Sequence, residues 1–131
     1  MSTMMIGPSA RDERFYSVMG RFFMNRQVRK DLPYLDDRDD KTWFLAMHGN
    51  SVVGFAGSYV EKGEAHLTSL WVAPEVRGYG FASELIRVRM IFNHGKPMRT
   101  MANPLAAPFY LRRGFEPLWT RGKYTQLRKA P

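Results

Sequence analysis

The sequence predicts one mixed α/β domain, in which a mostly antiparallel sheet is flanked by helices. Two stretches with helical spacing of apolar residues bracket a run of strand-like segments, and a last hairpin follows them. The 131 residues suit a single compact domain, residues 1–131. An apolar share of 44%, with nine Phe, six Tyr and three Trp, is enough to build its core.

The first forty residues predict helices and one short strand. The strand is expected over Met4–Gly7. A helix is expected over Ala10–Asn25 with Ser9 as its N-cap, because five large apolar side chains follow at helical spacing. Residues 26–41 are broken by Pro33 and by a run of aspartates, which predicts a short second helix or an irregular loop.

The middle of the chain has the composition of an antiparallel meander. Three segments rich in β-branched and aromatic residues are Trp43–Met47, Val52–Val60 and Ala65–Val72. The turns between them, at His48–Ser51 and Lys62–Gly63, contain the Gly and Asn that positive φ angles require. These three segments therefore predict consecutive hairpins.

In the last third, helical and strand periods alternate. An apolar stripe predicts a helix over Phe81–His94, which Gly95 ends. A strand over Met98–Asn103 and a short helix over Pro104–Arg113 are expected next. The final elements, Phe115–Thr120 and Tyr124–Arg128, predict a closing hairpin.

The loop before the third predicted helix carries the strongest functional signal. Gly78 and Gly80 let the backbone approach a ligand closely, and unpaired amides at a helix start bind phosphate. Arg77 adds a guanidinium that can hold phosphate through two hydrogen bonds. Two glycines alone are equally typical of a tight strand-to-helix turn.

Two motifs around this loop resemble the GNAT superfamily of acetyl-CoA-dependent N-acetyltransferases. The segment Val72–Ala82 reproduces the family's Val-x-Pro strand end followed by Arg-x-x-Gly-x-Ala, read from Arg77 to Ala82. A second motif follows at the family's spacing: Asn103, Ala106, Tyr110 and Gly114-Phe115. The resemblance covers roughly residues 43–120.

The resemblance implies a splayed sheet with acetyl-CoA in the wedge between the last meander strand and the strand that ends at Asn103. Pantetheine would pair with the main chain of Leu70, Trp71 and Val72. Asn103 and Tyr110 would lie near the thioester. The pyrophosphate would rest on the loop and the helix start: Arg77, Gly78, Tyr79, Gly80, Phe81, Ala82 and Ser83.

The same resemblance assigns Tyr110 as the general acid that protonates the departing thiolate. A phenol with a pKa of about 10 carries its proton at neutral pH. The base is left open between Glu64, His66 and a chain of waters. Because the chain has no cysteine to carry an acyl group, direct attack by the amine in a ternary complex is expected.

The charge distribution bears on the acceptor. Residues 76–131 hold eleven Lys and Arg against two acids, whereas residues 1–75 hold nine against ten. This basic half is equally typical of a solvated basic surface and of an anionic partner; if the partner is DNA or RNA, the acceptor amine would lie on a modified base or a charged tRNA. A protein amine, a small-molecule amine and a non-catalytic nucleic-acid-binding module remain alternatives, as does a regulator that holds the cofactor without turnover.

Several classes of protein are disfavoured. Without cysteine the chain has no disulfide framework or thiolate metal site, and its aspartate run lacks the spacing of a calcium loop, so no metal is expected. No apolar run approaches the roughly 20 residues of a membrane span, and no signal peptide is recognisable. We expect a cytoplasmic protein, monomeric or homodimeric.

Overall fold

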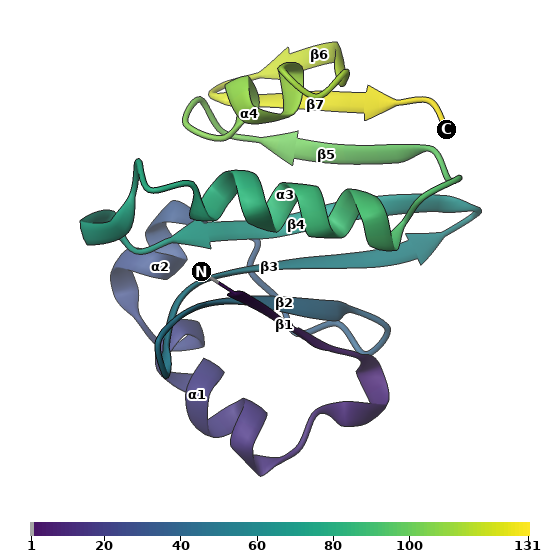
Figure 1. Ribbon diagram of the computed structural model, residues 1–131. Helices are drawn as coiled ribbons and strands as arrows, with labels where there is room; N and C mark the ends of the chain where they lie inside the picture. The colour runs from purple at the N-terminus through teal and green to yellow at the C-terminus, as the bar shows by residue number, and fades with distance from the viewer. Residues whose placement is uncertain (1) are drawn as a thin grey trace.

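The computed structural model describes residues 2–131, in which seven strands form one sheet (Figure 1). All neighbouring strands are antiparallel except β4 and β5, which are parallel. In sheet order the strands are β1 (Ser2–Ile6), β2 (Thr42–His48), β3 (Ser51–Glu61), β4 (Glu64–Val72), β5 (Met98–Ala102), β7 (Tyr124–Lys129) and β6 (Glu116–Arg121). The predicted meander and closing hairpin are confirmed.

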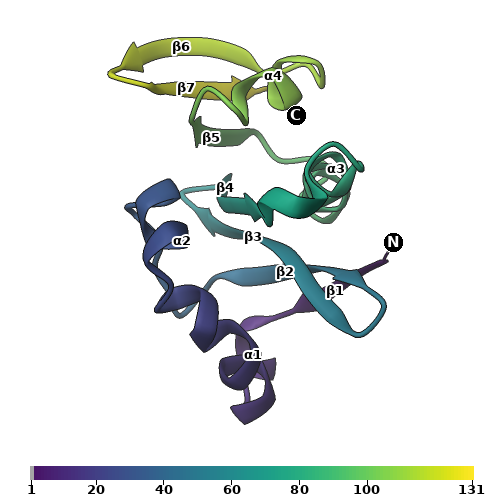
Figure 2. The ribbon, with the colours of Figure 1, turned by 90° about the vertical axis from the view of Figure 1, so that its left-hand side faces the viewer.

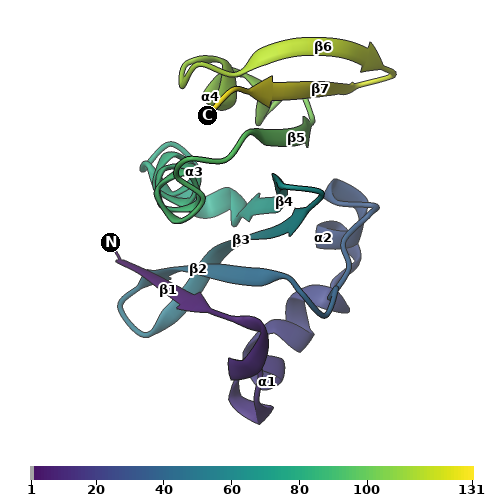
Figure 3. The same ribbon diagram turned by 90° about the vertical axis from the view of Figure 1, so that its right-hand side faces the viewer.

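Helices cover both faces of this sheet, as Figures 2 and 3 show. Helices α1 (Glu13–Phe23) and α2 (Arg26–Asp31) lie on one face, and α3 (Phe81–Phe92) and α4 (Ala107–Leu111) lie on the other. None of the helices within residues 2–131 combines the length and the apolar composition needed to cross a membrane.

The start of α1 differs from the sequence prediction. Ser9, the expected cap, lies in a short 3₁₀ turn over Pro8–Ala10, and the helix begins only after Asp12. The Asp12 carboxylate accepts the amide hydrogen of Phe15 at 3.0 Å. Both residues can cap a helix, so the period of the apolar residues alone could not choose between them. In the same way, Asn25 caps α2 by accepting from the next turn.

Each face of the sheet has its own core. On the α1 side, Trp43, Phe55 and Trp71 pack against Phe15 and Met19. The ring centres of Phe55 and Trp71 are 5.7 Å apart. On the α3 side, small and branched residues of β4 and β5 pack against α3 and α4. Both faces of the sheet are therefore covered by packed side chains.

The sheet divides between β4 and β5. The two strands pair only from Ala65 to Leu67, opposite Met98 to Thr100, and then separate. An irregularity in the β3–β4 pairing lies beside this point, and Ser69 takes a left-handed backbone with φ of 59°. A bulge bends a strand away from its neighbour. The structure therefore confirms the splayed sheet, with its fork at the C-terminal half of β4.

Candidate active site

The fork opens into a cavity of about 470 Å³. Its walls come from the end of β4, the loop after it, the first turn of α3, the segment after β5 and the end of α2. The residues that line it are Asp31, Leu32, Leu70, Trp71, Val72, Val76, Arg77, Gly78, Gly80, Phe81, Ala82, Ser83, Asn103, Leu105, Ala106 and Phe109. The volume is in the range of small-molecule and cofactor sites.

The loop between β4 and α3 presents backbone amides to this cavity. Gly78 and Gly80 have φ angles of 90° and 91°, which side chains rarely tolerate. The first hydrogen bond of α3 joins the Glu84 amide to the Gly80 oxygen at 3.0 Å. The amides at 81–83 consequently have no acceptor in a preceding turn, and amides of this kind at the positive end of a helix dipole are suited to bind an anion.

Most of the residues that the sequence assigned to the cofactor lie together here. Ten of them line this cavity: Leu70, Trp71, Val72, Arg77, Gly78, Gly80, Phe81, Ala82, Ser83 and Asn103. Tyr79 lies in the same loop, but its side chain is 71% exposed and does not line the cavity. Tyr110 also lies outside the lining, although its neighbour Phe109 belongs to it.

The Arg77 side chain is turned back onto the protein. Its Nε donates to the Val72 carbonyl oxygen at 2.9 Å, and its Nη2 lies 3.8 Å from a carboxylate oxygen of Asp31. Asp31 also accepts a hydrogen bond from the Trp71 indole at 3.2 Å. No sequence motif marked Asp31 as a cavity residue, because only tertiary packing brings the end of α2 to β4.

Tyr110 is buried beneath α3, with 1% of its surface exposed. Its hydroxyl accepts a hydrogen bond of 2.6 Å from Nη2 of Arg89, which is also fully buried. Arg89 donates in addition to the carbonyl oxygens of Leu85 and Gly57. Arg89 was not among the residues predicted for the site, yet a signal was present, since Arg89 occupies an inward position four residues after buried Leu85.

The two candidate bases lie on β4 away from the cavity lining. The Glu64 carboxylate is shared by Arg99 at 2.7 Å and Arg128 at 3.1 Å, and its bond to Arg128 is the main cause that lowers its pKa. The His66 ring stacks on Tyr59 with centres 4.8 Å apart. Burial, with a contribution from Arg99, lowers the pKa of His66.

No three His, Asp or Glu side chains within residues 2–131 are placed to hold a metal ion together. The cavity lining combines apolar walls and the backbone at the start of α3 with the polar side chains of Asp31, Arg77, Ser83 and Asn103.

Solved structures share this architecture. ElaA of Escherichia coli matches with a TM-score of 0.79 at 17% identity over 98% of each chain. An acyl-CoA N-acyltransferase from Pseudomonas aeruginosa also gives 0.79, at 14% identity over 98% of this chain and 99% of that one. The PaiA N-acetyltransferase of Thermoplasma acidophilum, solved with coenzyme A, gives 0.64 at 16% identity over the whole of both chains.

Among curated proteins, no sequence matches this chain. The model of the acetyltransferase (GNAT) family matches residues 12–115, which include the whole cavity lining. The chain belongs to the GNAT acetyltransferase family.

Proposed function

We propose that this protein transfers an acetyl group from acetyl-CoA to an amine by direct attack in a ternary complex. The observation that carries the proposal is the row of unpaired amides at the start of α3, which faces a cavity that ends at the fork. A diphosphate on these amides places the rest of an extended donor along β4. Such a donor would point its thioester into the fork.

The end of β4 suits the pantetheine arm. Beyond Leu67 the strand has no partner in β5, so the main-chain groups of residues 70–72 can pair with the amides of the donor as an added strand would. The amide near Val72 would donate to the thioester oxygen as negative charge develops on it. This pairing would fix the carbonyl carbon for attack from the acceptor side.

We assign the proton for the departing thiolate to Tyr110. Arginine can only donate, so in the bond with Arg89 the Tyr110 oxygen accepts and the hydroxyl hydrogen remains available to another acceptor. A small rotation of this side chain on CoA binding would be needed to reach the sulfur from its buried position.

For the acceptor we favour an amine carried by a polyanion such as DNA or RNA. The end of the molecule formed by α4, β6 and β7 (top of Figure 1) is rich in cations that form no ion pair within residues 2–131: Arg112, Arg113, Arg121, Lys123 and Lys129. Arg121 also lies over the exposed ring of Trp119, 5.4 Å from its centre. Cations interleaved with aromatic rings bind phosphates and stack on bases.

The test is acetyl transfer from acetyl-CoA, measured as free thiol released, across four acceptor classes: polyamines, amino acids, basic peptides, and total DNA or RNA. Transfer to nucleic acid that falls steeply as salt increases is the expected result. The double variant Arg121→Glu/Lys123→Glu should lose this transfer. The matched control Arg26→Glu/Lys30→Glu, with the same change of net charge on exposed α2 residues, should keep it.

Transfer to a small amine that is equally fast in both double variants would overturn the nucleic-acid acceptor and leave a small-molecule acetyltransferase. Absence of CoA binding, measured by calorimetry, would overturn the enzymatic proposal as a whole.

A further inference from the structure

Amide formation requires the acceptor amine to lose protons, and neither base candidate from the sequence is well placed for this. Glu64 is held by two guanidinium groups that stabilise its ionised form and make it a poor base. A third titratable group, the Lys41 amine, contacts Ser69 of β4, which directly precedes the cavity residue Leu70, although neither Lys41 nor Ser69 lines the cavity. Lys41 is fully buried, immediately before β2, on the face of the sheet that α1 and α2 cover.

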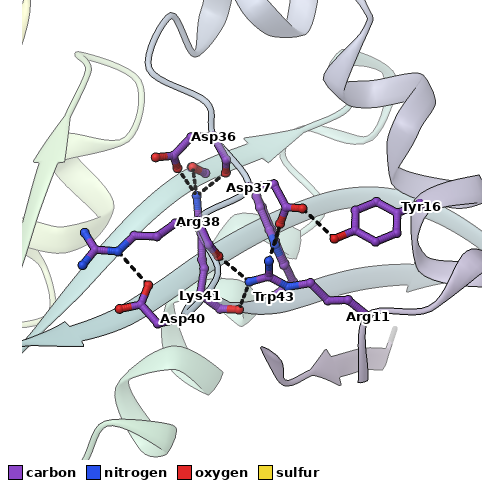
Figure 4. A network of polar contacts seen from close by, with 9 residues as sticks. Arg11, Tyr16, Asp36, Asp37, Arg38, Asp40, Lys41 and Trp43 are labelled. Atoms are coloured by element: carbon purple, nitrogen blue, oxygen red, sulfur yellow. Dashed lines mark hydrogen bonds and ion pairs between the residues drawn. The ribbon is translucent and has the colours of Figure 1, made fainter. Parts of the chain in front are cut away.

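The Lys41 amine ends among three oxygen atoms (Figure 4). Its Nζ lies 3.0 Å from the Asp36 carbonyl oxygen, 3.2 Å from Oδ1 of the Asp36 carboxylate and 2.7 Å from Oγ of Ser69. The ring of Trp43 is 4.3 Å away. A neutral amine has two hydrogens and one lone pair, so it can donate to both Asp36 oxygens and accept from Ser69.

Two backbone features are shaped around this lysine. Gly57 leaves the space that the aliphatic chain of Lys41 crosses, because a Cβ at Gly57 would lie 2.3 Å from Cε of Lys41. Ser69 holds a left-handed backbone, with φ of 59°, although it is not glycine. Such backbone strain concentrates at functional sites. Ser69 is only half-buried and directly precedes Leu70, which lines the cavity.

We propose that Ser69 and Lys41 relay a proton away from the acceptor amine, with the Asp36 carboxylate as the exit to solvent. The relay rests on the proposed acetyl transfer and supplies the base that this reaction needs. Asp36 suits the last position because its side chain is 66% exposed while it touches the buried amine. The three groups thus lead from the fork to water.

In this relay one proton leaves the acceptor amine and one reaches the departing thiolate. As the amine nitrogen bonds to the thioester carbon, its proton passes to Oγ of Ser69, and the Ser69 hydroxyl proton passes to Nζ of Lys41, which becomes an ammonium. The thioester C–S bond breaks, and the thiolate takes a proton from Tyr110. The ammonium then releases its extra proton to water by way of Asp36, and Tyr110 is reprotonated from solvent.

The charged groups around Lys41 are arranged as a lysine that accepts a proton requires. Burial is the largest influence and lowers its pKa, and the Arg11 guanidinium lowers it further. The Asp36 and Asp37 carboxylates act in the opposite direction. Arg11 donates to the Lys41 carbonyl oxygen and pairs with Asp37 at 2.7 Å, so its cation is fixed beside the lysine.

Three variants separate a relay from a structural role. Lys41→Arg places a permanent cation at this position, because arginine cannot give up its proton at any working pH. Lys41→Met retains the aliphatic packing. Ser69→Gly removes the hydroxyl while glycine accepts the left-handed backbone without strain. At pH 7 we expect each to lower kcat by about 10²–10⁴-fold, the range for a positioned base, with unchanged affinity for CoA.

Two further readouts belong to a relay alone. The double variant Lys41→Met/Ser69→Gly should be no slower than the slower single variant, because both substitutions break one path. The difference in kcat between Lys41→Met and the wild-type enzyme should also become smaller as the pH rises, because more of the acceptor amine is then neutral in solution. Full activity in Lys41→Arg or in Ser69→Gly would overturn the relay.

The control His66→Gln tests the other candidate base on β4. If kcat falls in that variant alone, the proton is accepted by His66 instead. The wild-type enzyme must first show acetyl transfer, so absence of any turnover would count against the proposed function. An unimpaired Lys41→Arg enzyme counts against the relay only.

Discussion

The guanidinium of Arg89 donates a hydrogen bond of 2.6 Å to the Tyr110 hydroxyl, and both side chains are buried between α3, α4 and the sheet. Within residues 2–131 no carboxylate pairs with this cation, which is instead surrounded by oxygen acceptors from Leu85, Gly57 and Tyr110. An uncompensated buried charge is costly. The second motif of the family and the α3 helix are therefore joined by a buried hydrogen bond, and we expect stability to depend on it.

Tyr110→Phe removes one of the acceptors of this cation. We expect the free energy of unfolding to fall by about 1–3 kcal/mol, because one guanidinium hydrogen loses its partner in a place that water does not reach. Urea denaturation measures this loss. In the same variant kcat should fall more than CoA affinity if Tyr110 donates the proton, and unchanged kcat would remove it from the chemistry.

Arg89→Met provides the matched background for that measurement. Once the cation is absent, Tyr110→Phe should cost much less stability than it does in the wild-type protein, since the two side chains form one interaction. Equal costs in the two backgrounds would show that the hydrogen bond contributes nothing to folding.

Gly78→Ala tests the amide-presenting loop. Nothing lies within 4 Å of the position of a new Cβ, so the substitution acts only through the φ angle of 90°. A left-handed conformation costs about 1–2 kcal/mol for a residue with a Cβ, and the loop should relax away from its phosphate-binding shape. We expect weaker CoA binding by calorimetry. Gly63→Ala, with φ of 76° in a distant turn, should lose stability without losing CoA affinity.

Asp31→Asn concerns the carboxylate that lies in the cavity wall. The asparagine oxygen can still accept from the Trp71 indole, but the negative charge near the proposed phosphate site is removed and Arg77 loses its carboxylate partner. An exposed charge pair is worth up to about 1 kcal/mol, so CoA should bind roughly threefold to fivefold more tightly at low salt. The control Glu75→Gln removes a carboxylate that does not line the cavity and should change affinity little.

Glu64→Gln should make stability less dependent on pH. The folded protein holds the pKa of Glu64 below its ordinary value, chiefly through Arg128. A carboxylate with a lowered pKa stabilises the fold at any pH above the pKa that it has in the unfolded chain, near 4.5. This stabilisation is lost as the pH falls through the lower pKa of the folded protein. The variant should therefore melt at a lower temperature than wild type at pH 7, and the difference should shrink at acid pH. A constant difference across this range would contradict the assignment.

Much of this protein could be predicted from local sequence. The glycines of the loop, the alternating strands and the spacing of Asn103, Ala106 and Tyr110 are short-range signals, because backbone angles and side-chain period depend on near neighbours. For the same reason most cavity residues between Leu70 and Ser83 were found as two short runs, residues 70–72 and 77–83, although Val76 between them was missed. Boundaries were less certain, as the change of cap from Ser9 to Asp12 shows.

What the sequence by itself determined is thus the family, the order of the elements and the anion-binding loop. Only the tertiary structure brought Asp31 to Arg77, Lys41 to Ser69 and Arg89 to Tyr110, which are separated in the chain by 21 residues or more. No local pattern encodes such pairs, because their geometry arises when the bulged sheet and the helices pack against each other. Burial in this packed structure then decides which of these charged side chains lack a counter-ion.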